Sequence, residues 1–224
     1  MIRRPPRSTP LYSSAASDVY KRQDEFVVDI FQTGSGTSTN MNANEVISNV
    51  AIKNLGGEIG SRNPVHPNDH VNKGQSSNDV IPTAIHIAGC IGITESLIPS
   101  LEKLKNSLSE KSEEFWDVIK TGRTHLQDAT PIRLGQEFLG YSGQIDESIK
   151  RAKNSLSELS ILALGGTAVG TGIGMQKGFS KKVIEKLSKR FKINFTESSN
   201  HFHSQSTIDS VSYTHLTLPT NREV

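Results

Sequence analysis

Two long runs of helical hydrophobic periodicity constrain the fold more than any other feature of the sequence. Residues 134–163 carry apolar side chains every three or four positions, which predicts a helix of about seven turns or more. A second run extends from residue 77 towards Trp116, and Pro99 is expected to kink or interrupt it. Helices this long are typical of helical bundles. The sequence therefore predicts a mostly α-helical fold without clear alternating strands.

Shorter segments complete this organisation. Residues 40–55 predict a helix that ends at Gly56-Gly57, and residues 180–191 predict another short helix. Polar, glycine-bearing or proline-bearing segments connect the helices, at residues 33–39, 62–75, 121–131 and 165–174. The last of these lacks the Lys of a P-loop and follows a helix pattern, which predicts a tight connection and not a nucleotide-binding loop.

The two ends differ in composition from the rest of the chain. Residues 1–23 are rich in Arg, Pro and Ser and carry a net charge of +4, whereas residues 24–211 carry −2. Residues 1–23 lack a helical or strand period, and residues 211–224 interrupt a helix-like pattern and contain Pro219. Both ends resemble translated adapter sequence, with native disordered tails as the alternative. We therefore set aside residues 1–23 and 211–224 as non-native or disordered tails.

Composition argues against several classes of protein. A single Cys90 cannot form a disulfide within the chain and fits a reducing, cytoplasmic setting. The longest apolar stretch, residues 84–93, is shorter than the about 18–20 residues that a membrane span needs. The body of the chain has no basic stripe with interleaved aromatic residues, and no His pair has a matching Cys or carboxylate cluster. We expect no nucleic acid, no membrane and no metal as partners.

Three polar loops carry the candidate chemistry, at residues 34–37, 75–79 and 122–128. Hydroxyls, amides and backbone N–H groups at helix starts suit a small dianion. His125 is the natural proton carrier near neutral pH.

Each loop also has a purely structural interpretation. Ser77 and Asn78 are good candidates to cap a helix, and Ser35 and Thr37 to form a turn. A single His in a loop, such as His125, is more often structural or solvated than catalytic. Composition alone leaves these alternatives open.

Four long motifs carry a resemblance to a known family. They are SGTSTNMNANEV, HPNDHVNKGQSSNDVIPTA, GRTHLQDATPIRLGQE and LALGGTAVGTGIG, at residues 35–46, 66–84, 122–137 and 162–174. In this order they resemble the fumarase/aspartase superfamily, and most closely the class II fumarases, over residues 24–210. The third motif has His125 where an aspartase is expected to have Gln.

The resemblance implies a fold and a reaction. Residues 24–75 would belong to the N-terminal lyase domain, and residues 76–210 to the first part of the central long-helix bundle. The family adds water reversibly to fumarate to give (S)-malate, without a metal or an organic cofactor. It acts as a homotetramer whose active sites combine loops from three subunits.

The resemblance also implies roles for individual residues. His125 would be catalytic. The residues implied to bind substrate carboxylates are Ser35, Gly36, Thr37, Ser76, Ser77, Asn78 and Thr124. A secondary dicarboxylate site would comprise His66, Pro67, Asn68 and Asp69, for which a structural turn is an equally weighted alternative.

One element of the family is missing. The catalytic Ser of the family lies in a loop Gly-Ser-Ser-x-Met-Pro-x-Lys-x-Asn, and the Ser-Ser-Asn at residues 198–200 lacks its Gly, Met, Pro and Lys. We therefore expect a fragment of a fumarate hydratase that is inactive alone. The alternatives are a non-catalytic helical module that binds dicarboxylates or oligomerises, and a fragment of an aspartate ammonia-lyase.

Overall fold

The computed structural model describes residues 23–29, 31 and 34–207. The predictions about the tails therefore lie almost wholly outside the described residues. The chain divides into two compact units, Met1–Lys73 and Gly74–Val224, and each is described by itself.

Helix α2 (Thr37–Asn54) dominates the first unit, after a short 3-10 turn η1 (Gln23–Glu25). The helix that the sequence predicts at residues 40–55 is confirmed, with a start three residues earlier. Gly56 adopts the left-handed conformation that ends it (φ 78°). A π-helical turn η2 (Pro67–Val71) packs against α2, and the Ser48 hydroxyl donates to the Val65 carbonyl at 2.6 Å.

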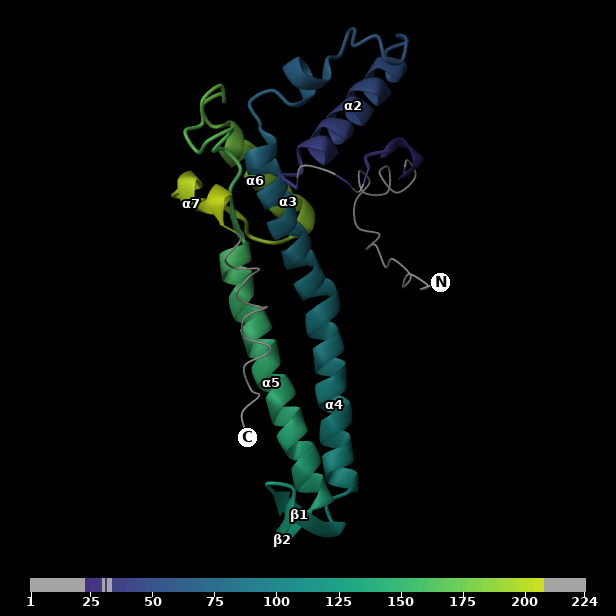
Figure 1. Cartoon of the computed structure of the whole chain (residues 1–224), viewed down its shortest axis with the longest axis vertical. Helices are drawn as coiled ribbons and strands as arrows, with labels where there is room; N and C mark the ends of the chain where they lie inside the picture. The colour runs from purple at the N-terminus through teal and green to yellow at the C-terminus, as the bar shows by residue number, and fades with distance from the viewer. Residues whose placement is uncertain (1–22, 30, 32–33, 208–224) are drawn as a thin grey trace. The chain divides into compact units, whose positions relative to one another are not determined.

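The second unit is built on one long helix. Helix α3 (Ser77–Gly92), the π-helical segment η3 (Ile93–Leu97) and helix α4 (Ile98–Glu114) run on without a break (Figure 1). The long predicted helix is confirmed. Pro99 does not interrupt it: Pro99 lies in the first turn of α4, directly after the π-helical segment η3, and a first helical turn tolerates a residue without an N–H.

Helix α5 (Leu134–Leu159) lies beside α4 and runs antiparallel to it (Figure 1). The Ser112 hydroxyl donates to the Gly135 carbonyl at 2.8 Å, and the Ser109 and Ser142 hydroxyls lie 2.8 Å apart. Small side chains at the contact let the two helices approach closely. The predicted helix at residues 134–163 is confirmed up to Leu159.

A β-hairpin joins α4 to α5. Strand β1 (Ile119–Thr124) pairs antiparallel with β2 (Gln127–Arg133) through the two-residue turn His125-Leu126. The expectation of a polar loop without strands is wrong here. The hairpin is largely exposed, so its residues show no alternation of polar and apolar side chains, and its turn lacks the Asn-Gly type of signal.

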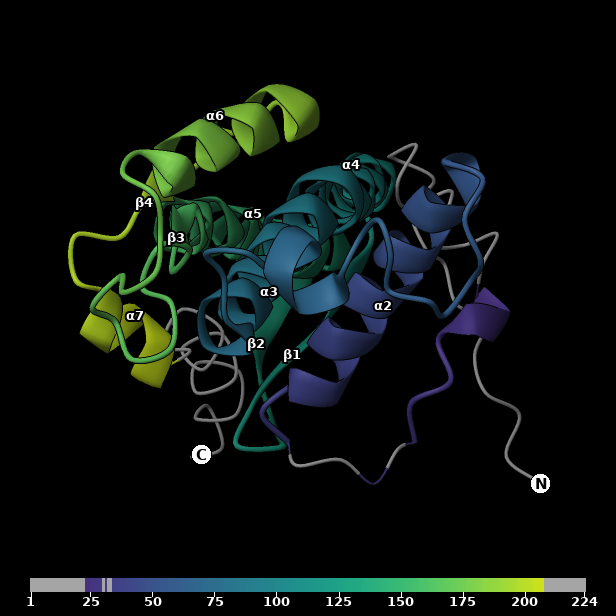
Figure 2. The ribbon, with the colours of Figure 1, turned by 90° about the horizontal axis from the view of Figure 1, so that it is seen from above.

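The other end of α5 meets a small head of short elements (Figure 2). Strand β3 (Ile161–Leu162) pairs in parallel with β4 (Thr196–Glu197), and helices α6 (Phe179–Phe191) and α7 (His201–Ser206) flank them. The apolar core of the unit lies here, formed by Cys90, Leu159, Leu162, Leu164, Ile184 and Phe195. Burial raises the pKa of the Cys90 thiol from 9.0 to about 11, so Cys90 is the buried apolar residue that the sequence predicts.

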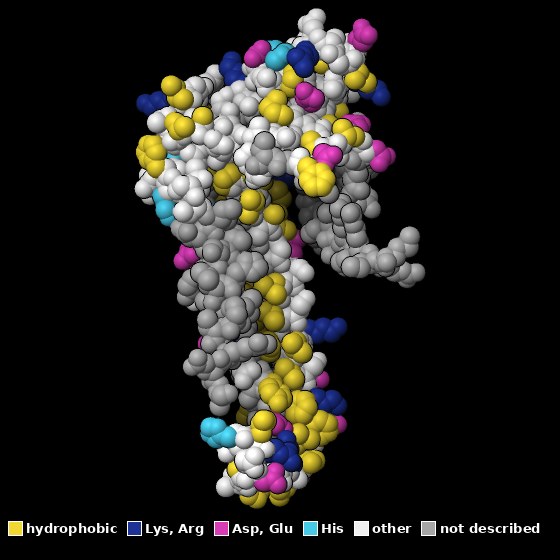
Figure 3. Space-filling model, viewed as in Figure 1, with side chains coloured by type: hydrophobic (Ala, Val, Ile, Leu, Met, Phe, Trp, Pro, Cys, Tyr) yellow, Lys and Arg dark blue, Asp and Glu magenta, His cyan; other side chains and the backbone are white. Residues whose placement is uncertain are grey.

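The helix Ser77–Glu114 meets the length and composition of a membrane span, with a mean hydropathy of 1.4 over an 18-residue window that is 11% buried. The expectation that no stretch is long enough counted only uninterrupted apolar residues. The core helix of a soluble protein can have the same length and composition, although such a helix is mostly buried. Apolar side chains form a band on the visible face of the α4–α5 pair (Figure 3). Such a surface marks an interaction face.

Candidate functional site

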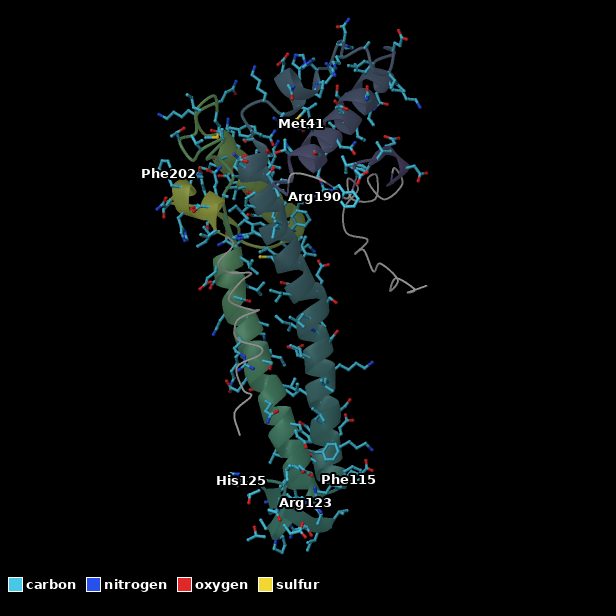
Figure 4. All side chains as sticks on the ribbon, viewed as in Figure 1. Met41, Phe115, Arg123, His125, Arg190 and Phe202 are labelled. Carbon is cyan, nitrogen blue, oxygen red and sulfur yellow. The ribbon has the colours of Figure 1, made fainter. Side chains whose placement is uncertain are left out.

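His125 lies at the tip of the β1–β2 hairpin (Figure 4). His125 and Leu126 both have positive φ, 50° and 59°, a conformation that is uncommon for residues other than glycine. Thr124 and Gln127 pair on either side of this turn, and an ion pair of 3.1 Å joins Arg123 to Asp128. The hairpin thus places an exposed imidazole on a protruding turn.

Ser76, Ser77 and Asn78 lie at the opposite end of this unit, where α3 begins. Ser76 is the N-cap: its hydroxyl accepts the Asn78 backbone N–H at 3.2 Å. The Asp79 carboxylate accepts the Ser76 backbone N–H at 2.9 Å, which completes a capping box. Ser77 and Asn78 are therefore the first helical residues and not the caps that the sequence suggested.

A turn that follows α5 in the chain packs against this start of α3. The Asn78 amide nitrogen donates to the Ala168 carbonyl at 2.7 Å. The Asp79 carboxylate also accepts backbone N–H groups of Gly165, at 3.2 Å, and Thr167, at 2.9 Å. The sequence places Asp79 only in the polar loop, since nothing local signals contacts to residues 86 and 88 positions away.

The two candidate sites of this unit are far apart. Helix α5 separates them, and its 26 residues span about 40 Å at the usual rise of about 1.5 Å per residue. The hairpin and the start of α3 occupy opposite ends of the helical pair (Figures 1 and 4). A single copy of the chain therefore cannot bring His125 to the same ligand as Asn78.

Ser35 and Thr37 lie in the first unit, at the start of α2. Their hydroxyls are 3.0 Å apart, and Gly36 between them takes the left-handed conformation, with φ 75°. Two hydroxyls at a helix N-terminus form a small polar surface suited to an anionic oxygen. The same geometry fits the turn that the sequence also suggests.

His66, Pro67, Asn68 and Asp69 form the start of η2. The His66 Nδ1 atom accepts the backbone N–H groups of Asn68 at 3.3 Å and Asp69 at 3.2 Å, so it caps this turn. The same His66 Nδ1 atom lies 3.2 Å from a carboxylate oxygen of Asp69. A hollow of about 110 Å³ lies alongside, lined by Glu45, Ser48, Asn49, Gly60, Arg62 and Pro67.

Comparisons with known proteins give the family. A model described as lyase matches residues 12–220. The class II fumarate hydratase of Chlamydia caviae is 50% identical over 209 residues, covering 92% of this chain and 45% of the relative. The mitochondrial fumarate hydratase of Saccharomyces cerevisiae is 51% identical, covering 92% and 42%. The crystal structure of class II fumarase from Schistosoma mansoni superposes with a TM-score of 0.83 at 41% identity, covering 88% of this chain and 45% of that one.

The resemblance and the fold that the four motifs imply are thereby confirmed. The chain spans less than half the length of the curated relatives it matches. A mostly helical lyase fold, with about half of the residues shared with fumarate hydratases, accounts for the long helices and for the polar loops. The chain belongs to this family of lyases.

Proposed function

We propose that this chain is the part of a class II fumarate hydratase that supplies three of its polar loops, and that the complete protein hydrates fumarate reversibly to (S)-malate. One observation carries the proposal. An exposed imidazole and a polar helix start lie at opposite ends of an antiparallel helical pair, in a chain half identical to fumarate hydratases.

The proposed chemistry follows from the side chains. Removing a proton next to a carboxylate leaves an intermediate with extra negative charge on that carboxylate. Preorganised hydroxyl, amide and N–H donors stabilise such charge. We assign this binding to Ser35, Gly36, Thr37, Ser76, Ser77, Asn78 and Thr124. His125 positions the water or protonates the hydroxyl side of the reaction, and no cofactor is needed.

The proposed active site is shared between copies. The about 40 Å between the hairpin and the start of α3 requires that one copy supply His125 and Thr124 while another supplies Asn78. A homotetramer with a shared helix bundle provides this arrangement. It also covers the exposed apolar face of Ser77–Glu114.

We place this protein in the tricarboxylic acid cycle and in the cytoplasm. The single buried Cys90 supports a reducing compartment. The yeast relative is mitochondrial by name, so the compartment is the first part of this proposal to check by localising a tagged protein.

The exposed apolar face of Ser77–Glu114 also favours a second candidate, a non-catalytic module that oligomerises through its long helices. Such a module would form a defined oligomer by itself. The proposed fragment should instead aggregate when it is expressed alone.

A chimera tests the proposed function. Residues 24–207 replace the matching segment of the Chlamydia caviae relative, which supplies the missing loop, and we call the product the completed protein. Fumarate hydration is followed by the loss of fumarate absorbance. Turnover within about tenfold of the unaltered relative supports the proposal. A folded tetramer without turnover would contradict it.

A further inference from the structure

Asp79 has a larger role than capping a helix. Its side chain is fully buried, with 0% of its surface exposed, and it makes no ion pair with the described Lys or Arg side chains. One oxygen accepts the Ser76 N–H, as the cap requires, and the other accepts the N–H groups of Gly165 and Thr167. A buried carboxylate is stabilised only by such donors. The second oxygen is therefore committed to the distant turn.

That turn needs the support. Thr167 has φ 56°, which is strained for a β-branched residue, and Gly165 has φ 116°. Asp79 binds the Thr167 N–H, and the Gln205 amide donates to the Thr167 carbonyl at 2.7 Å. Thr167 is 4% exposed, and its hydroxyl has no partner among the described residues. The surrounding bonds, and not the local sequence, hold this conformation.

The same turn orients the side-chain amide of Asn78. A carbonyl oxygen can only accept, so the amide nitrogen and not the amide oxygen of Asn78 must face Ala168 at 2.7 Å. This bond fixes both ends of an exposed amide. A ligand carboxylate that approaches the start of α3 therefore meets the Asn78 amide in a single orientation.

We propose that Asp79 is a positioning residue: it holds the Gly165–Ala168 turn against the first turn of α3, and the turn holds the Asn78 amide ready for a substrate carboxylate. This inference rests on the proposed function and assigns a residue that acts through another. Asp79 does not touch the substrate itself.

The first test uses hydrogen exchange in the completed protein, because the fragment is expected to aggregate when it is expressed alone. Asp79→Asn removes the negative charge and replaces one acceptor oxygen with a donor, so the hydrogen bonds to the Gly165 and Thr167 N–H groups weaken even where the remaining oxygen faces the turn. The peptide that covers residues 165–168 should exchange about tenfold faster, as expected for the loss of a hydrogen bond to a charged group. Ser112→Ala is the control, because it removes a buried hydrogen bond to Gly135 at the other end of the helix. Unchanged exchange in Asp79→Asn, or an equal rise in the control, would overturn the proposal.

The second test uses the kinetics of the completed protein. Asp79→Asn should raise KM for fumarate about tenfold and lower kcat as well, because a misplaced Asn78 weakens binding of the substrate carboxylate and, more strongly, of the more highly charged intermediate. Ser112→Ala should change neither constant. An unchanged KM in a protein that hydrates fumarate contradicts the assignment of Asp79 alone. Failure of the unsubstituted completed protein contradicts the proposed function instead.

The Gln205→Met variant tests the same turn in case the Asp79→Asn variant does not fold. It removes the other bond to Thr167 and leaves the helix cap intact. KM should rise in the same direction by a smaller factor, about threefold, because the Asp79 bonds remain. A normal KM here, together with a normal KM in Asp79→Asn, would leave the turn without a part in binding.

Discussion

At the scale of single residues, His125 differs from the other described histidines in where it lies in the fold. His125 is exposed at the tip of a hairpin, while His66 caps a turn and the His86 ring contacts the Ile161 carbonyl at 2.8 Å. Sequence alone assigned His125 to proton transfer through the family resemblance. The structure adds its place on a protruding, exposed hairpin turn.

His125→Gln in the completed protein should lower kcat by about 100-fold or more, because Gln can neither donate nor accept a proton near neutral pH. Stability should be unchanged, since the side chain is exposed. The measurement is the rate of fumarate hydration beside a thermal unfolding curve. His203→Gln, another exposed histidine, is the matched control, and turnover at the unsubstituted level in His125→Gln would remove His125 from its assigned role.

Cys90 gives a pH-dependence with a definite sign. Its thiol loses a proton at about 9 in the unfolded chain and at about 11 in the folded one. The folded state therefore holds more protons above pH 9, so the free energy of unfolding falls by up to about 1.4 kcal/mol per pH unit between pH 9 and 11. Urea unfolding of the completed protein and of its Cys90→Ala variant across this window checks it. Equal slopes in the two proteins would contradict the account.

At the scale of the elements, Gly135 sets how closely α4 and α5 approach. A Cβ atom at Gly135 would lie 2.3 Å from the Ser112 carbonyl oxygen, whereas one at Gly140 meets nothing within 4 Å. Gly135→Ala should therefore destabilise the completed protein by about 1–3 kcal/mol through overpacking. Gly140→Ala should stabilise it by about 0.5–1 kcal/mol through helix propensity. Denaturant unfolding compares the two, and equal effects would show that the helices can separate at little cost.

The helices could be predicted because each has apolar side chains at a regular helical spacing over a long segment. The hairpin was not, since its pairing satisfies the backbone of residues whose side chains stay in water. The observed N-cap of α3 lies one residue before the predicted one. Both Ser76 and Ser77 are able to cap a helix, and only the contact with Asp79 selects Ser76. The links from Asp79 to Gly165 and Thr167 join segments that no local pattern connects.

At the scale of the whole molecule, the length of the helical pair decides how a site can form. A span of about 40 Å keeps Thr124 and His125 away from Ser76, Ser77 and Asn78 of the same copy. We therefore propose that each active site combines these residues from different copies of the chain. Each copy contributes its hairpin to one site and the start of α3 to another.

Subunit mixing tests this claim most directly. In the completed protein, His125→Gln and Asn78→Ala should each lose most activity when assembled alone. Co-expression and purification of mixed oligomers should restore a clear fraction of turnover, because some sites then receive the intact hairpin of one variant and the intact helix start of the other. Mixed oligomers that stay as inactive as either variant alone would show that both residues come from one copy, and would contradict the shared site.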